Sequence, residues 1–541
     1  MKNNLILFVI ALLLFSCSST SKKMDLSQEE LTKFNASFIY SDGTEFYRSP
    51  SEPVINSSFL SRLRVKRSST TEVNLIIGDK KIEMVKESRD DMFDYFVAEV
   101  KTGTDPIYFY YEVKQDKKAV FYSRRGFELK KPINSYMFKV FPGFTIPTWS
   151  KGAVLYQIYV DRFNNGDPAN DVLTNEYMYD NWPSVKVNNW NRYPDSQTPY
   201  SKGGNRTREF FGGDLEGVIQ KIDYLKDLGI DGVYFNPLFV SPSNHKYDSQ
   251  DYDNVDPHLG VIVNDGGELI NPELDPNYKN PVTGNPSSVN KDATKYIKRV
   301  TDKENLDASN KKLQELISKF HSNNMKVILD GVFNHSGSFN KWLDRENIYP
   351  GNEGAYESKD SPFLKYFIFS KDQWPQNESY EAWWGYKTLP KLNFEDSKEL
   401  ENNILNMSAN WVGSGFNADG WRLDVAADLG KSASYNHKFW QMFRDKVKGA
   451  NNESVIYAEV YGDSSGWLNG KEWDSVMNYD AFFEPVSFFL TGLEKHSYYK
   501  RDDLLNNSKN FEKDLREKMA KLPYNSLMAS MNQLDNHDHS R

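Results

Sequence analysis

Between residues 38 and 144, apolar and polar side chains alternate in short runs that Gly, Asp and Pro interrupt. Side chains of a β-strand point alternately to its two faces, so a period of two predicts half-buried strands. The clearest runs are residues 62–66, 73–77, 95–100 and 107–113. Short strands at regular spacing predict an all-β sandwich, which we place at residues 38–145.

After Pro147 the pattern changes to apolar runs separated by residues at helical spacing. The runs that read as strands are residues 153–160, 232–235, 326–330, 420–425, 454–459, 475–477 and 526–531. The helical faces between them are Leu215, Val218, Ile222, Leu225 and Leu228; Leu313, Leu316, Ile317 and Phe320; and Leu400, Ile404, Met407 and Trp411. Strands that alternate with amphipathic helices predict a parallel sheet covered by helices.

Polar side chains collect where several of these strands finish, at Asp330, Asp424, Glu459 and Asp538. Side chains at the carboxyl ends of parallel strands form the active site of a TIM-type barrel. The predicted fold class is therefore α/β, with a (β/α)8-type TIM barrel in residues 146–541 after the N-terminal β-sandwich. Two insertions interrupt the alternation of strands and helices, at about residues 260–307 and 336–395. The second is expected to form a subdomain after the third strand.

Composition narrows the class of protein. Of 541 residues, 39% are apolar and 26% are charged, which fits a globular chain rather than a disordered or membrane-spanning one. The net charge is −9 and no block of basic residues occurs, so we expect no nucleic-acid partner.

The N-terminal residues read as a targeting segment. Lys2 precedes an unbroken apolar run at residues 5–15, too short to span a bilayer, and Cys17 follows in a stretch similar to a bacterial lipoprotein cleavage box. Cys17 is the single cysteine, which fits a lipid attachment point. We expect a lipoprotein signal peptide at 1–17, a polar tether at 18–37, and lipid anchoring to a membrane of the bacterial cell envelope, at the outer membrane or cell surface or facing the periplasm. The alternative is an ordinary signal peptide with an incidental cysteine.

The hexapeptide at residues 420–425 places Arg422 and Asp424 on one face of a strand whose surroundings are apolar. A neighbouring cation keeps a buried carboxylate ionised, which suits a nucleophile, although the same pattern fits a structural ion pair. Glu459 ends an apolar strand and has no neighbouring cation in the sequence, so we expect burial to raise its pKa.

Four separated motifs resemble glycoside hydrolase family 13, the α-amylase family, in the order that the family has them. They are DGVFNH at 330–335, GWRLD at 420–424, AEV at 458–460 and LDNHD at 534–538. LPKLN at 389–393 and SNHKYD at 243–248 are similar to the neopullulanase, cyclomaltodextrinase and maltogenic amylase group. The resemblance covers about residues 150–541.

The resemblance implies a retaining α-glucan hydrolase that uses three carboxylates: Asp424 as nucleophile, Glu459 as acid/base and Asp538 on the sugar hydroxyls. It further implies that Arg422 holds Asp424, that His335 and His537 bind the same sugar ring, and that Tyr247 stacks beneath it with His245 nearby. The implied substrates are α-1,4 and α-1,6 bonds of starch, maltooligosaccharides, pullulan or cyclodextrins. The alternatives are a transglycosylase of the same fold and a non-catalytic surface glycan-binding protein.

A further cluster, at residues 165–171, places four oxygen-bearing side chains just after the first barrel strand. Ca²⁺ prefers six to eight oxygen ligands. The cluster resembles the calcium loop of the neopullulanase group, which implies a Ca²⁺ site formed by Asn165, Asp167, Asn170, Asp171, Gly212 and Asp214. The alternative is an Asx-rich turn that needs no metal.

Three features depart from the group. Ala427-Asp428 stands where Asn-Glu is usual, which leaves the preferred bond open, and Tyr461 stands where Trp is common. The chain stops at Arg541, before an eighth barrel unit, so we expect a fragment of a longer protein. The sandwich resembles carbohydrate-binding modules in size and position only. Packing, or a homodimer formed through this N-terminal domain, are equal alternatives.

Overall fold

The computed structural model describes residues 35–70, 72–115, 118–180, 182–192, 207–271, 290–349, 351–494 and 499–539. The predicted signal peptide, including Cys17, lies outside these residues. The chain divides into two compact units, one of Ala153–Glu459 and one of Met1–Gly152 with Val460–Arg541, and each is described by itself. In the described residues, no helix combines the length and the apolar character that crossing a membrane requires.

The residues before Gly152 form two antiparallel sheets, as the alternating pattern predicts. One sheet has the order β1-β2-β6-β5, and the other has the order β4-β3-β7-β8-β9 with β10 paired to β7. Their bounds are β1 Arg48–Ser49, β2 Ser58–Lys66, β3 Glu72–Ile77, β4 Lys80–Glu83, β5 Val85–Arg89, β6 Phe93–Lys101, β7 Ile107–Gln115, β8 Lys118–Ser123, β9 Gly126–Glu128 and β10 Phe138–Val140. The four strands expected from sequence correspond to β2, β3, β6 and β7.

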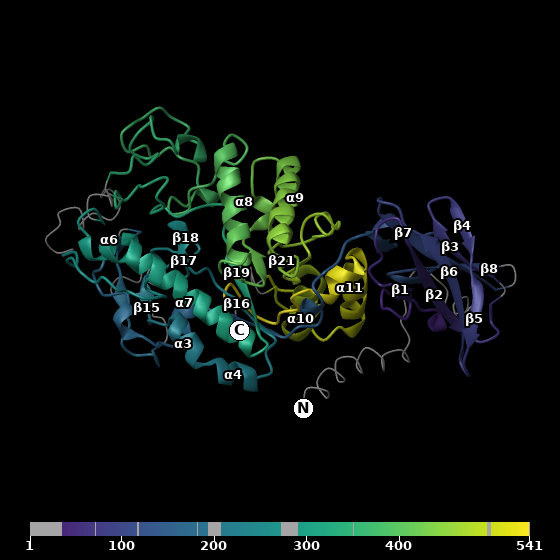
Figure 1. The fold of residues 1–541 in the computed structure, drawn as a ribbon. Coiled ribbons are helices and arrows are strands. Elements are labelled where there is room, and N and C mark those ends of the chain that lie inside the picture. Colours follow the sequence, from purple (N-terminus) through teal and green to yellow (C-terminus); the bar gives the residue numbers. More distant parts are fainter. Residues whose placement is uncertain are drawn as a thin grey trace. The chain divides into compact units, whose positions relative to one another are not determined.

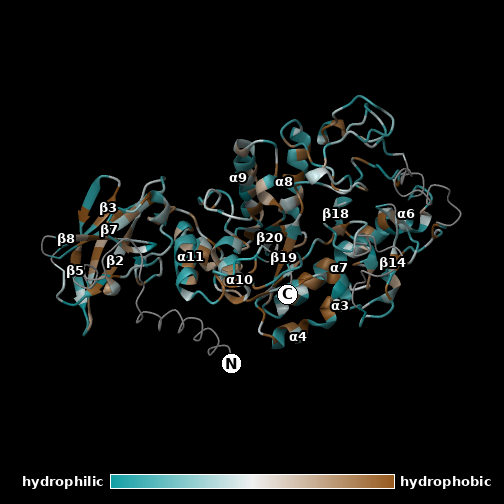
Figure 2. Ribbon diagram, turned by 180° about the vertical axis from the view of Figure 1, so that it is seen from behind, coloured by the Kyte–Doolittle hydropathy of each residue, from teal (hydrophilic) through white to brown (hydrophobic). Residues whose placement is uncertain are grey.

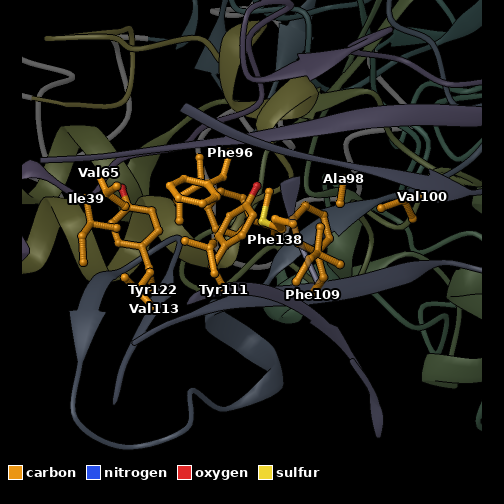
Figure 3. Close-up of a cluster of buried hydrophobic side chains, with 14 of the residues drawn as sticks. Ile39, Val65, Phe96, Ala98, Val100, Phe109, Tyr111, Val113, Tyr122 and Phe138 are labelled. Carbon is orange, nitrogen blue, oxygen red and sulfur yellow. The ribbon is translucent and has the colours of Figure 1, made fainter. Parts of the chain in front are cut away.

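The core of this sandwich lies between the sheets, where alternate residues of the strands meet. Figure 3 shows side chains from several strands gathered there, among them Phe96, Phe109, Tyr111, Tyr122 and Phe138. The rings of Phe109 and Phe138 stack with their centroids 5.2 Å apart. Burying apolar area of this kind is the main favourable contribution to the free energy of folding.

The unit Ala153–Glu459 is built on parallel strands that lie in the order β11-β16-β19-β20-β21. Their bounds are β11 Leu155–Ile158, β16 Gly232–Phe235, β19 Lys326–Gly331, β20 Gly420–Leu423 and β21 Val455–Ala458. The helices between successive strands are α3 Leu215–Gln220, α4 Ile222–Asp227, α6 Thr294–Thr301, α7 Lys303–Ser322, α8 Lys398–Val412 and α9 Ala433–Ala450 (Figure 1). Parallel strands joined through helices confirm the predicted β/α alternation.

The long helices follow from their apolar spacing and their capping residues. Leu313, Leu316, Ile317 and Phe320 are buried on α7, whose other residues are mostly polar, so Figure 2 colours the helix in both teal and brown. Ser397 caps the start of α8, and its hydroxyl accepts the N–H of Leu400 at 3.3 Å. A serine at this position satisfies one of the backbone donors that a helix start leaves open.

The described part of residues 460–539 includes β22 Ser475–Val476, a π-helical turn at Tyr479–Phe483, and the helices α10 Glu484–Thr491, α11 Ser508–Lys521 and α12 Tyr524–Met528. The predicted strand at 526–531 is wrong, because its first half belongs to α12. Only Met531 retains strand-like pairing, in a single parallel bridge with Met477. The run SLMASM lacks β-branched residues, and short apolar runs of this kind fit a helix as well as a strand.

The two expected insertions have different outcomes. Residues 272–289 of the first lie outside the described part, and its last portion is helical, in α6 and the start of α7. The second, at 336–395, is mostly loop, with bridges such as Phe369–Tyr380 and buried tyrosines that include Tyr356 and Tyr366. The domain limits at 145 and 146 stay a prediction.

Candidate active site

The strand register places three functional positions at one edge of the sheet. Asp330 lies opposite Arg422 in the pairing of β19 with β20, and Leu423 lies opposite Ala458 in the pairing of β20 with β21. Asp424 and Glu459 directly follow these last two residues. The sheet therefore brings the carboxyl ends of three neighbouring strands together, as predicted for this fold.

Arg422 is the centre of this group, and its side chain is completely buried. Nη1 donates to both carboxylate oxygens of Asp330, at 3.0 Å each, and to Oδ1 of Asp424 at 2.9 Å. Burial alone lowers the pKa of Arg422, but the charges of Asp330 and Glu459 raise it well above its usual value. The predicted pairing of Arg422 with Asp424 is confirmed, and Arg422 stays charged.

The sequence shows no cation beside Glu459, and the surroundings expected from this are wrong in one respect. A cation does contact it, because Nη2 of Arg422 lies 3.0 Å from Oε2. The same oxygen accepts the backbone N–H of Val425 at 3.0 Å. Sequence proximity could not reveal this cation, since Arg422 reaches Glu459 across neighbouring strands. The carboxylates of Asp424 and Glu459 thus contact the same guanidinium, one at each terminal nitrogen.

Asp330 anchors the other side of the guanidinium. Its Oδ2 accepts hydrogen bonds from the hydroxyls of Tyr234 and Tyr247, both at 2.8 Å. Burial raises the pKa of Asp330, and the charge of Arg422 opposes this shift. The side chain therefore orients Arg422 and Tyr247. Tyr234 is a site residue that sequence reasoning missed, because a tyrosine inside an apolar strand reads as core.

His335 is buried beside Tyr247. Its Nε2 donates to the backbone oxygen of Tyr247 at 3.1 Å, and its Nδ1 lies 3.3 Å from the amide nitrogen of Asn334. Burial lowers the pKa of His335 to about 4, so the ring is neutral near pH 7. Its ring stacks on Trp383, with centroids 5.2 Å apart. Trp383 was also missed, since it lies in the aromatic insertion without a motif.

His245 is close to Tyr247, as predicted, and the two rings are stacked at 6.0 Å. Nδ1 of His245 accepts the backbone N–H of Tyr247 at 3.1 Å. This contact gives His245 a structural role in the turn that presents Tyr247. Lys391 donates to the backbone oxygen of Asp428 at 2.9 Å, next to the motif that departs from the family group.

Val425 directly follows Asp424 and adopts left-handed backbone angles, with φ 45° and ψ 41°. A β-branched residue rarely takes this conformation, because its side chain crowds the backbone. The turn ends β20 and aims the N–H of Val425 at Glu459. Strained residues of this kind cluster at functional sites.

The residues predicted to bind calcium lie close together, but only some of them have buried oxygen atoms without a hydrogen-bond partner. Oδ1 of Asn165 and Oδ1 of Asn170 are buried and have no hydrogen-bond partner. A side chain at Gly212 would lie 1.9 Å from Oδ1 of Asp171, so glycine leaves a cradle there. Asp171 also pairs with Lys186. These oxygens fit a cation.

The other two acidic residues of the predicted calcium site, Asp167 and Asp214, accept hydrogen bonds from backbone N–H groups instead. Asp214 caps α3 by accepting the N–H of Gly217 at 2.6 Å, and it also accepts the N–H of Asp167 at 2.8 Å. Asp167 accepts the N–H of Ala169 at 3.1 Å. In the described part of the chain, no group of three or more His, Cys, Asp or Glu side chains is arranged to hold a metal.

His537 and Asp538 belong to the other compact unit. Nε2 of His537 lies 3.3 Å from Oδ2 of Asp538, and the N–H of Asp538 donates to Oδ1 of Asn536 at 2.9 Å. Their placement beside Asp424 and Glu459 stays a prediction.

The model for the α-amylase catalytic domain matches residues 157–271 and 275–541. The chain belongs to the α-amylase family. The model for the N-terminal Ig-like domain of α-amylases matches residues 53–142, which contain most of the sandwich. The predicted combination of a TIM-barrel catalytic domain with an N-terminal β-sandwich is thereby confirmed.

Relatives within the α-amylase family agree with the group that the motifs indicated. A cyclomaltodextrinase from Thermoanaerobacter pseudethanolicus is 32% identical over 76% of this chain and 59% of its own length. Neopullulanase 2 from Thermoactinomyces vulgaris is 28% identical over 90% of this chain and 70% of its own length. This chain therefore spans less than two thirds of the first of these relatives.

Solved structures show the same fold. The type III pullulan hydrolase from Thermococcus kodakarensis has a TM-score of 0.59 and 23% identity, over 93% of this chain and 73% of the other. A cyclomaltodextrinase has a TM-score of 0.56 and 25% identity, over 94% of this chain and 73% of the other.

Proposed function

We propose that this member of the α-amylase family is a retaining glycoside hydrolase that cleaves glucosidic bonds of α-glucans. The observation that carries the proposal is the single guanidinium of Arg422, which holds Asp424 and Glu459 at the ends of adjacent strands. Retaining hydrolysis uses two carboxyl groups about 5–5.5 Å apart, whereas inversion needs room for a water between them. Two groups that share one guanidinium favour retention.

The proposed reaction has two steps. Asp424 attacks the anomeric carbon while Glu459 gives its proton to the departing glycosidic oxygen, which leaves a covalent glucosyl-enzyme. Water then attacks the same carbon as Glu459 takes a proton from it, and Asp424 is released. Arg422 stabilises the negative charge that returns to Asp424, and Asp538 is proposed to hold sugar hydroxyls in the transition state.

Several of the residues proposed to bind sugar lie near the same carboxyl edge of the parallel sheet. Tyr247 is fixed by Asp330 and offers a ring face for stacking. Neutral His335 is proposed to hydrogen-bond the ring that occupies this site, together with His537, while His245 supports Tyr247. The proposed substrates are starch, maltooligosaccharides, pullulan and cyclodextrins.

Release of reducing sugar from these four substrates by the full chain tests the proposal. At nearly constant volume, Asp424→Asn removes the nucleophilic carboxylate and Glu459→Gln removes the group that gives and takes the proton, and we expect activity to fall by about 10³-fold or more. The matched control is Asp445→Asn on the exposed face of α9, which should leave activity unchanged. Unchanged activity in both site variants contradicts the assignment.

Product analysis at high acceptor concentration separates two alternatives from hydrolysis. Longer oligosaccharides in place of reducing ends identify a transglycosylase that passes the glucosyl group to a sugar. Binding of glucan without any turnover identifies a surface glycan-binding protein, a role that the separately expressed residues 38–145 also test.

We propose a Ca²⁺ ion at the loop of residues 165–171, held by the side-chain oxygens of Asn165 and Asn170 with Asp171. The support is the pair of buried amide oxygens without partners, since a cation satisfies such atoms. A bound ion would stabilise the loop. Thermal unfolding in EDTA and in Ca²⁺ tests this, with Asn165→Ala as the variant that should lose the difference.

We also propose that Cys17 carries a lipid that anchors the protein in the bacterial cell envelope. The support is the apolar run at 5–15 and the position of Cys17 after it. Mass spectrometry of protein from a bacterial host, with Cys17→Ser as control, tests lipidation. Self-association through the sandwich is a further proposal that sedimentation of the full chain can decide.

A further inference from the structure

Two adjacent tryptophans, Trp383 and Trp384, lie at the tip of a hairpin loop beside the candidate active site. The loop covers residues 381–391, and its two arms meet in a backbone bridge between Ala382 and Pro390. The N–H of Trp383 also donates to the backbone oxygen across the tip, at residue 389, over 2.9 Å. The tip is therefore a defined turn held by backbone hydrogen bonds.

The second arm of this hairpin pairs with the segment that follows β19. Lys391 forms an antiparallel bridge with His335, and the N–H of Ser336 donates to the backbone oxygen of Pro390 at 2.9 Å. The same segment carries His335 in the candidate active site. The backbone pairing therefore fixes the hairpin beside that residue.

Trp383 contacts two parts of the site through its side chain. Its ring stacks on that of His335, with centroids 5.2 Å apart and planes 12° apart. Its indole Nε1 donates to Oδ2 of Asp428 at 3.1 Å, four residues after Asp424. Lys391 donates to the backbone oxygen of Asp428 at 2.9 Å. These contacts hold the indole of Trp383 in one orientation.

Trp384 extends this aromatic surface outward. Its ring centroid lies 5.3 Å from that of Trp383, and 76% of the residue surface is exposed. Its backbone is left-handed, with φ 52° and ψ 21°, a conformation that crowds a bulky side chain. Both the exposed ring and the backbone angles are unfavourable for folding, and such features are retained where a site uses them.

A single exposed aromatic side chain is common on protein surfaces. Trp384 differs because its ring continues through Trp383 to the ring of His335. The surface is thus continuous with the candidate active site, and the exposed carboxylate of Asp428 lies at its edge. A pyranose ring presents C–H groups on its faces and hydroxyls around its rim, so it fits an aromatic ring beside hydrogen-bonding groups.

We propose that Trp384, supported by Trp383, is a stacking site for a glucose unit of the bound glucan next to or beyond the unit that reacts at Asp424. This inference rests on the proposed function, since the occupant is the same chain whose reacting unit lies beside Tyr247. Trp384 adds affinity for glucan chains of several units. Trp383 is a positioning residue that holds Trp384 and His335.

The experiment measures maltoheptaose binding by calorimetry, using the full chain with Asp424→Asn so that turnover is suppressed. Adding Trp384→Asn removes the ring, and asparagine tolerates left-handed backbone angles, so the hairpin stays folded. We expect the Kd of maltoheptaose to rise about tenfold. Trp384→Phe keeps an aromatic face and should raise the Kd by less than about threefold.

Kinetics of the otherwise wild-type chain give a second readout. Trp384→Asn should raise KM for maltoheptaose about tenfold with a much smaller change in kcat, because stacking is equally strong before and during the reaction. The matched control is Tyr224→Asn, which removes an exposed ring from α4, and it should leave both Kd and KM unchanged. If Trp384→Asn does not fold, Trp384→Gly makes the same test, since glycine favours a positive φ.

Three results overturn the stacking site. The first is an unchanged Kd and KM in Trp384→Asn, and the second is an equal loss in Trp384→Asn and Tyr224→Asn. The third is a change of oligomeric state in Trp384→Asn with unchanged Kd, measured by sedimentation, which identifies a second copy of the chain as the occupant.

Failure of the stacking site and failure of the proposed hydrolase give different results. If Asp424→Asn abolishes hydrolysis but Trp384→Asn changes neither Kd nor KM, the hydrolase stands and the stacking site is contradicted. If the wild type hydrolyses no glucan but Trp384→Asn weakens maltoheptaose binding, the stacking site is supported and the hydrolase is contradicted.

Discussion

At the scale of single residues, Arg422 determines the geometry of the site, because its two terminal nitrogens reach three carboxylates. Lysine carries the same charge on one nitrogen and cannot span them. We expect Arg422→Lys to lower kcat by about 10²-fold or more with little change in KM, as measured with soluble starch. Arg501→Lys is the control, and activity within twofold of wild type in Arg422→Lys contradicts this role.

His258 lies outside the candidate active site and is a second residue whose charge has a testable effect, in this case on stability. Its Nε2 lies 2.8 Å from Glu176 and its Nδ1 lies 2.9 Å from Asp256. A neutral imidazole has a single N–H, so two carboxylate contacts require the charged ring. Burial opposes this charge, but the carboxylates of Glu176 and Asp256 outweigh it and raise the pKa of His258 above 6.5.

A raised pKa in the folded state means that the stabilisation is complete below the pKa of the unfolded chain and is lost as pH rises through the folded pKa. We therefore expect His258→Asn to cost about 3 kcal/mol at pH 6 and clearly less at pH 9. Urea unfolding of both proteins at the two pH values measures this. Lys246 and Arg299 also face these carboxylates and remain in the variant. A penalty that does not change with pH contradicts a charged His258.

At the scale of elements, the contact between β20 and β21 places Asp424 beside Glu459. A Cβ at Gly420 would lie 2.3 Å from the backbone oxygen of Val455, so only glycine allows this approach. We expect Gly420→Ala to lower the free energy of unfolding by about 1–3 kcal/mol. Gly449→Ala on α9 meets nothing within 4 Å and should raise it by about 0.5–1 kcal/mol. Equal effects of the two substitutions contradict the strand contact.

Hydrophobic periodicity predicted the central elements well. Residues 232–235 match β16, and the helical faces at Leu313–Phe320 and Leu400–Trp411 lie on α7 and α8. It failed at 526–531, where the residue types favour neither state strongly. Within the site, motifs identified Asp424, Glu459 and His335. The contact of Arg422 with Glu459 and the support of Asp330 by Tyr234 depend on strand register, which composition and spacing do not determine.

At the scale of the whole molecule, the chain combines a β-sandwich with the catalytic domain of the α-amylase family. Its motifs for the proposed reaction fall in both compact units, with Asp424 and Glu459 in one and Asp538 in the other. The three carboxylates of the proposed reaction are therefore distributed over both units.

In the proposed reaction, Asp424 forms a covalent bond with the substrate. Incubation of the full chain with 5-fluoro-α-glucosyl fluoride, followed by digestion and mass spectrometry, tests it directly. Fluorine at C5 slows the second step, so the intermediate accumulates. We predict a fluoroglucosyl adduct on the peptide that contains Asp424, and no adduct in Asp424→Asn. An adduct on Glu459 or Asp538, or steady consumption of the probe by wild type without any adduct, would show that Asp424 is not the nucleophile.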